Sequence, residues 1–291
     1  MTEQTTRSAL TRRAAVAGLL AAPSLALPNA AVRAGDSVAV PDGRAATPGS
    51  VAAPRVAFSC IATPQAVAGP YYFDPKLSRL DVTEGHPGVP LRIRLVVIDT
   101  ASCQPLTGAR IDIWHARADG FYSGYRGQGD NHKIDTTGGT FMRGTQETDA
   151  QGEARFHTVY PGWYIGRTPH IHFKVFTDQR NVLTAQMYFP DALSQYLFGN
   201  VDAYRRKRPR DTFNVNDSLA LMDSSHGGFC DIREQADHYL ATLILGVDRS
   251  ATAWADDAWP PPGMTSESMA RHAGAVAIVP GVPRSLQKEF D

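Results

Sequence analysis

Residues 91–98 read Leu-Arg-Ile-Arg-Leu-Val-Val-Ile, and this stretch decides the fold class. Its apolar residues recur at every second position, a period typical of a β-strand with one buried face. Residues 109–114 show a second alternation of the same kind, and the polar residues 99–105 between them fit a turn. Two neighbouring strands are therefore expected at the start of the folded region.

Further strand patterns follow at short intervals, at residues 154–159, 170–176, 182–189 and 239–247. Amphipathic helical patterns do not separate them, and 25 glycines and 20 prolines are spread along the chain. Residues 120–144 form a long, polar, glycine-rich stretch of the kind that leaves a sheet as a functional loop. We predict an all-β protein, a β-sandwich with long active-site loops and few or no long helices.

The charge balance excludes some classes of partner. The chain of 291 residues has 29 Lys and Arg against 29 Asp and Glu, so its formal net charge is zero. We therefore expect no nucleic-acid partner. The basic run at residues 205–208 is interpreted as a solvated loop. Beyond the N-terminal segment, apolar runs are too short for a transmembrane helix, so no stable membrane insertion is expected.

The N-terminal segment has the pattern of an export signal. Arg12 and Arg13 precede an apolar run at 14–27, followed by small residues. Residues 1–34 are predicted to be a twin-arginine-type signal peptide, so the protein is expected to be periplasmic or extracellular. A disordered basic tail is the alternative.

The rest of the chain divides into a linker at 35–57, a folded domain at 58–250 and an extended C-terminal tail at 251–291. Its three cysteines, Cys60, Cys103 and Cys230, lack the spacing of a zinc site. An oxidising compartment permits one disulfide among them, and the pairing is left open.

The stretch His170-Ile171-His172 indicates a metal centre. Alternate residues of a strand share a face, so the two imidazoles stand side by side. Taken alone, the pair fits two surface histidines better than a metal site. Tyr164, just after a Pro-Gly turn, and Tyr122, in the long loop, add two phenols. Phenolates favour a trivalent ion, so this set points to Fe(III). Buried tyrosines with hydrogen-bonded hydroxyls are the alternative.

Several local motifs occur together over residues 60–220. They are Gly69-Pro70-Tyr71-Tyr72, Ile111-Asp112-Ile113-Trp114-His115-Ala116 with Gly120-x-Tyr122-Ser123, Thr148-Asp149-x-x-Gly152, Tyr160-Pro161-Gly162-Trp163-Tyr164, Arg167-x-x-His170-Ile171-His172 and Gln186-x-Tyr188-Phe189. In their order and spacing they resemble the intradiol ring-cleavage dioxygenases, the family that contains catechol and protocatechuate dioxygenases. The domain at 58–250 is thus expected to be an intradiol dioxygenase-like catalytic domain.

The resemblance implies one Fe(III) per chain, with the protein ligands Tyr122, Tyr164, His170 and His172. Tyr125 is the alternative for the first tyrosine. Tyr164 would be displaced when substrate binds, Arg167 would lie beside the substrate, and Gln186 would orient Arg167. The expected reaction uses O2 to cleave a catechol-type ring, a small aromatic diol, between its two hydroxylated carbons, giving a cis,cis-muconate-type product.

Two other functions compete with this one. An exported β-sandwich that binds a ligand would need neither the tyrosines nor Arg167, and a copper or zinc protein would need only the histidine pair. The chain lacks the N-terminal helical segment by which catechol-type members dimerise, and a homo-oligomer is possible. The residues do not indicate which catechol is used.

Overall fold

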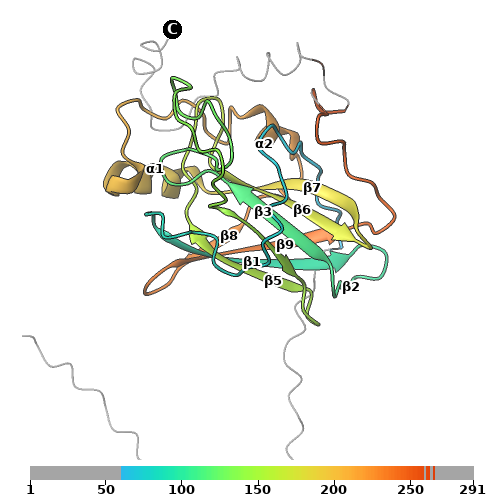
Figure 1. The fold of residues 1–291 in the computed structure, drawn as a ribbon. Helices are drawn as coiled ribbons and strands as arrows, with labels where there is room; N and C mark the ends of the chain where they lie inside the picture. Colours follow the sequence, from blue (N-terminus) through green and yellow to red (C-terminus); the bar gives the residue numbers. More distant parts are fainter. Residues whose placement is uncertain (1–59, 259, 263–264, 266–291) are drawn as a thin grey trace, which may run out of the picture. The chain divides into compact units, whose positions relative to one another are not determined.

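Two β-sheets form the folded domain in a computed structural model that describes residues 60–258, 260–262 and 265. The first sheet runs in the order β4 (Arg143–Glu147), β3 (Arg110–His115), β6 (His170–Thr177) and β7 (Arg180–Tyr188). The second runs in the order β2 (Gln104–Pro105), β1 (Pro90–Asp99), β9 (Tyr239–Val247) and β8 (Asp231–Glu234), with β5 (Glu153–Val159) also paired to β1. Figure 1 shows the two layers, and the predicted all-β sandwich is confirmed.

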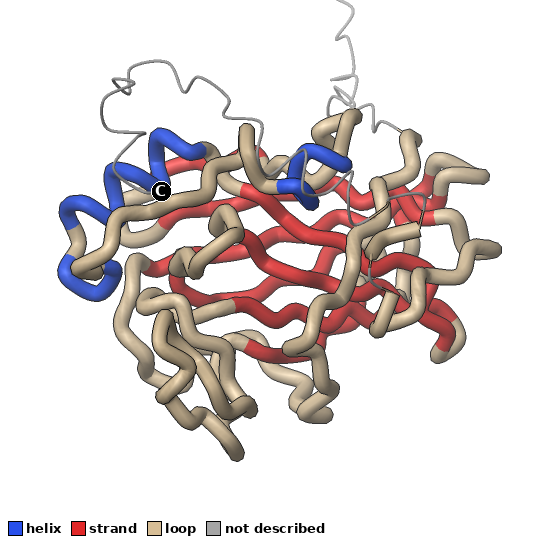
Figure 2. The backbone as a smooth tube through the Cα atoms, turned by 90° about the horizontal axis from the view of Figure 1, so that it is seen from above, coloured by secondary structure: helices blue, strands red, loops and turns tan. Residues whose placement is uncertain are grey.

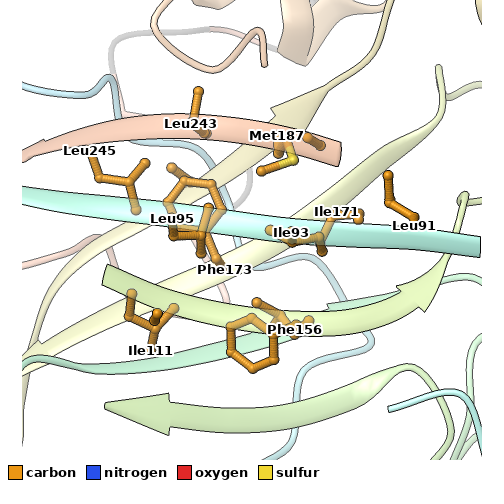
Figure 3. Close-up of a cluster of buried hydrophobic side chains, with 14 of the residues drawn as sticks. Leu91, Ile93, Leu95, Ile111, Phe156, Ile171, Phe173, Met187, Leu243 and Leu245 are labelled. Carbon is orange, nitrogen blue, oxygen red and sulfur yellow. The ribbon is translucent and has the colours of Figure 1, made fainter. Parts of the chain in front are cut away.

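The core is built from the alternating apolar residues of both sheets. Leu91, Ile93 and Leu95 of β1 lie in the same buried cluster as Ile171 and Phe173 of β6 (Figure 3). Fully burying a side chain of this size stabilises the fold by about 1.5–3 kcal/mol. Slipping either strand by one residue would turn its apolar set outward, so the core fixes which side chains face away from it.

The helices are short, as expected: α1 (Asp191–Asn200), the 3₁₀ turn η1 (Asp202–Tyr204) and α2 (Ser218–Met222). A short strand was expected before the turn at 149–152 but without a range, and it is β4; the helix α1 was not predicted. β4 reads Arg-Gly-Thr-Gln-Glu, which has no apolar alternation, and it is held by its pairing with β3. The N-terminus of α1 has no side-chain cap, so the usual start signal is missing.

Loops and the helix α2 gather on the outer face of the β4-β3-β6-β7 sheet, away from β1 and β5, whereas α1 lies at one end of the strands (Figures 1 and 2). The segment at 63–72 is one of them, because the Ala66 amide donates to the Thr184 carbonyl of β7 at 2.8 Å. The long loop at 116–142 is another. These segments therefore cover the side chains of β3, β6 and β7 that point away from the core.

A disulfide joins Cys60 to Cys103, which leaves Cys230 as a half-buried free thiol. The bond ties the start of the segment that hydrogen-bonds to β9 and β7 to the turn between β1 and β2. The three cysteines permitted one disulfide, and the structure contains it and supplies the pairing. Among the described residues, no helix has the length and apolarity needed to span a membrane.

The predicted C-terminal tail starts by folding back onto the domain. Residues 251–258 contain no helix or strand, and the Trp254 amide donates to Gln65 Oε1 at 3.0 Å. Asp256 forms an ion pair with Lys174, which is buried on β6. The predicted signal peptide and linker lie outside the described residues, as does most of the tail.

Candidate metal centre

The two histidines stand on the outer face of β6, as their spacing predicts. Their Nε2 atoms are 3.0 Å apart, and both side chains are buried. The ring of Trp114, on the neighbouring strand β3, stacks on His172 with 4.7 Å between centroids and 10° between planes. The carbonyl of Thr168 lies 2.6 Å from His170 Nδ1. Each ring is therefore held in one orientation by its surroundings.

Two tyrosines complete the cluster from different loops. The hydroxyls of Tyr122 and Tyr164 each lie 3.3 Å from His170 Nε2. Tyr122 is fixed through its backbone: its amide donates to Gln128 Oε1 at 2.9 Å, and the Thr136 hydroxyl donates to its carbonyl at 2.6 Å. All four predicted ligands thus converge on one point.

Tyr125, the alternative first tyrosine, points elsewhere. Its hydroxyl donates to the backbone carbonyl of Tyr72 at 2.9 Å, and its ring meets Tyr71 edge-on at 5.2 Å. Tyr125 therefore supports the loop that carries Tyr122, and its oxygen lies outside the converging set.

Burial sets the protonation of the cluster. It lowers the pKa of His170 to about 3 and that of His172 well below its ordinary value, so both imidazoles are neutral at pH 7. Burial likewise raises the pKa of the Tyr164 hydroxyl, and that of Tyr122 well above the ordinary range, the nearby Tyr164 adding to the latter shift. Phenolates here would require a cation in direct contact.

The donor set fits a ferric ion. His170 Nδ1 donates to the Thr168 carbonyl, which directs the lone pair of Nε2 into the cluster. Nδ1 of buried His172 has no hydrogen-bond partner in the part of the chain that the structure describes. That part also contains no group of three or more His, Cys, Asp or Glu suited to hold a metal. Two imidazole nitrogens with two phenol oxygens suit Fe(III) better than zinc or calcium.

Arg167 lies beside the cluster in a buried ion pair. Its Nε donates to Asp217 Oδ2 at 2.9 Å, and Nη2 donates to Gln186 Oε1. Burial alone would raise the pKa of Asp217, but Arg167 and the Thr168 amide hold it below its ordinary value. The expected contact between Arg167 and Gln186 is present, and Arg167 ends the turn that begins at Tyr164.

Asp217 is a site residue that the sequence did not reveal. Its carboxylate accepts from Arg167, from the Thr168 amide at 2.8 Å and, as the cap of α2, from the Leu219 amide at 2.9 Å. The cap was the one available signal, but a helix of only 5 residues leaves too little periodic pattern to show it.

A cavity of about 280 Å³ opens onto Tyr122 and Tyr164. The other residues that line it are Tyr71, Gly120, Gly127, Gln128, Gly129, Asp130, His132, Ile165 and Arg206. Arg206 was predicted to be solvated with the rest of its basic run, and this is wrong: its side chain is 12% exposed and lies in the cavity wall. Arg205, Lys207 and Arg208 are exposed, as expected.

Known proteins are similar to this chain in sequence and in fold. A family model described as "Dioxygenase" matches residues 63–198. A chlorocatechol 1,2-dioxygenase of Pseudomonas putida is 35% identical over 149 residues, which are 43% of this chain and 52% of that protein. A solved intradiol ring-cleavage dioxygenase from Tetranychus urticae is 27% identical, with a TM-score of 0.60, and the match covers 67% of this chain and 98% of that one. Over its folded domain the chain is similar to the intradiol ring-cleavage dioxygenases.

Similarity within the intradiol family does not single out one substrate type. The beta chain of a protocatechuate 3,4-dioxygenase from Burkholderia cepacia is 34% identical over 122 residues, 38% of this chain and 50% of that protein. The chain therefore spans about half the length of the curated relatives that it matches. These matches include a chlorocatechol dioxygenase and a protocatechuate dioxygenase, so only the residues that line the cavity can distinguish between the two substrate types.

Proposed function

We propose that this chain is an Fe(III)-dependent intradiol dioxygenase, which uses O2 to cleave a catechol-type ring between its hydroxylated carbons to a cis,cis-muconate-type product. The observation that carries the proposal is the convergence of two phenol oxygens and two imidazole nitrogens at the base of a cavity. One iron per chain would be held by Tyr122, Tyr164, His170 and His172. An exported metal- or ligand-binding sandwich without this activity is the alternative.

The ligands divide into a fixed and a displaceable group. When bound, ferric iron would act as Lewis acid and template for the two oxygens of the diol. His170 and His172 are buried on the outer face of β6, and Tyr122 is 1% exposed. Tyr164 sits in a turn next to exposed Ile165 and lines the cavity, so it is the ligand best placed to move. Its freed oxygen would accept a proton from the incoming diol.

Arg167 would stabilise negative charge that develops on the ring. Its guanidinium is held on one side by Asp217 and on another by Gln186, so it needs no reorganisation during the reaction. Gln186 is itself fixed, because its Nε2 donates to the Val67 carbonyl at 3.1 Å. Gln186 is therefore a positioning residue for Arg167.

The first prediction concerns the metal and the identity of its tyrosine ligand. Purified protein should contain about one iron per chain and absorb broadly in the visible, because phenolates donate charge to ferric iron. Tyr122→Phe should weaken or shift that band. It should also lower turnover by more than the roughly 10–100-fold that is typical when a residue that only orients a metal ligand is changed. Metal analysis, absorption spectra and oxygen uptake provide the measurements.

Tyr125→Phe is the matched control, since it removes the same atom from the same loop. Its spectrum should stay close to that of the unmodified protein, because its hydroxyl reaches only the Tyr72 carbonyl. Stoichiometric zinc without a visible band would contradict the iron assignment. A spectrum altered by the Tyr125 change and not by the Tyr122 change would move the ligand.

The second prediction separates the catalytic role of Arg167 from its structural role. Arg167→Gln should keep the iron and its colour but lower kcat by about 10²–10³, the usual cost of removing one preorganised group. The same change leaves the Asp217 charge buried and unpaired, so stability should fall by about 3–5 kcal/mol.

The double variant Arg167→Gln with Asp217→Asn tests whether the two losses are independent. It removes both charges, so much of the stability should return while kcat stays low. Denaturant unfolding and steady-state kinetics measure the two quantities. Recovery of kcat along with stability would show that Arg167 acts only through the fold.

We further propose that the protein is exported through its twin-arginine-type signal. The Cys60–Cys103 disulfide supports this, since such bonds persist in oxidising compartments. Arg12→Lys combined with Arg13→Lys should retain active enzyme in the cytoplasm, as cell fractionation would show. Undiminished export of that variant would point to another route.

A further inference from the structure

Asp130 and Arg206 form an ion pair in the wall of the cavity above the metal centre. The Arg206 guanidinium stacks over the Trp163 ring at 4.0 Å, its Nη1 donates to the Trp163 carbonyl at 2.6 Å, and its Nη2 donates to Asp130 Oδ1. The side chains of Arg206 and Asp130 are 12% and 38% exposed. The Arg206 guanidinium thus contacts a ring, a carbonyl and a carboxylate of the protein itself.

The local backbone is shaped to admit this arginine. Gly120 has φ +86°, and a Cβ there would lie 2.3 Å from the Trp163 carbonyl oxygen and 3.0 Å from Arg206 Nη1. A residue other than glycine would therefore displace the guanidinium from its position on Trp163. Asp130 follows Gly129 in the long loop, so the ion pair joins that loop to the segment after η1.

The rest of the cavity lining carries no second guanidinium, ammonium or carboxylate among the described residues. Tyr71 contributes an aromatic ring and Ile165 an apolar side chain. The Nδ1 atom of His132 lies 3.0 Å from the Gly127 carbonyl. Gln128 is 3% exposed, its Oε1 accepts from the Tyr122 amide at 2.9 Å, and its Nε2 is buried. The opposite charges of Asp130 and Arg206 therefore cancel, and the described lining offers no guanidinium or ammonium that is free of a carboxylate partner.

We propose that the Asp130–Arg206 pair sets the charge selectivity of the site, so that it takes catechols with uncharged ring substituents and rejects carboxylated ones. This inference rests on the proposed function. A carboxylate entering the cavity would lose its hydration, find Arg206 already neutralised and meet the like charge of Asp130. A neutral substituent meets none of these costs.

Asp130→Asn tests the proposal because it keeps the shape of the side chain and releases the charge of Arg206. The measurement is the dissociation constant of catechol and of 3,4-dihydroxybenzoate on iron-loaded protein without oxygen, followed by kcat/KM for both in air. The unmodified protein should bind and turn over catechol better. In Asp130→Asn the preference for catechol should fall by about tenfold, an effect that added salt weakens.

Asp119→Asn is the matched control. Asp119 lies in the same loop, its side chain is 39% exposed, and it pairs with Arg117 at 2.7 Å outside this cavity, so the preference should stay within about twofold of the unmodified value. A similar change in both variants, an unchanged preference in Asp130→Asn, or an initial preference for the carboxylated diol would each overturn the inference. Failure of the unmodified protein to bind either diol would instead overturn the proposed function and this inference with it.

Discussion

The alternation of side chains along β6 is the constraint on which the site depends. Ile171 and Phe173 must enter the core, so His170 and His172 must stand together on the opposite face. The ring of Trp114, delivered by the neighbouring strand, then stacks on His172. Burial of the core therefore also holds the two imidazoles in position. A bound metal would not have to organise the histidine half of its site.

The other half of the site comes from loops, which gives it different physical properties. Tyr122 is tied through its backbone to Gln128 and Thr136, whereas Tyr164 occupies a turn that opens on the cavity. With two ligands on a strand and two on loops, the proposed site could keep an iron ion while one tyrosine gives way to a substrate. The buried Arg167–Asp217 pair adds a fixed positive charge next to this movable part.

Local patterns predicted the sandwich, the orientation of the histidine pair and the residues that converge. The family resemblance favoured Tyr122, and Tyr125 stayed an alternative because the path of a glycine-rich loop has no period. Spacing also gave no basis for the pairing of Cys60 with Cys103, which depends on where the chain crosses the sheet. Asp217 and Arg206 were missed for a related reason. Asp217 meets Arg167 from 50 residues away, and one arginine within a basic run differs from its neighbours only by its tertiary contacts.

The central claim is that these four side chains support ring cleavage by insertion of dioxygen, and isotope labelling tests it most directly. Iron-loaded protein would be given catechol and isotopically heavy O2, and the product examined by mass spectrometry. The account predicts a ring-opened dicarboxylic acid that carries both labelled oxygen atoms in one molecule. A quinone with hydrogen peroxide, or a product without label, would show that the centre oxidises catechols by another reaction and would contradict the account.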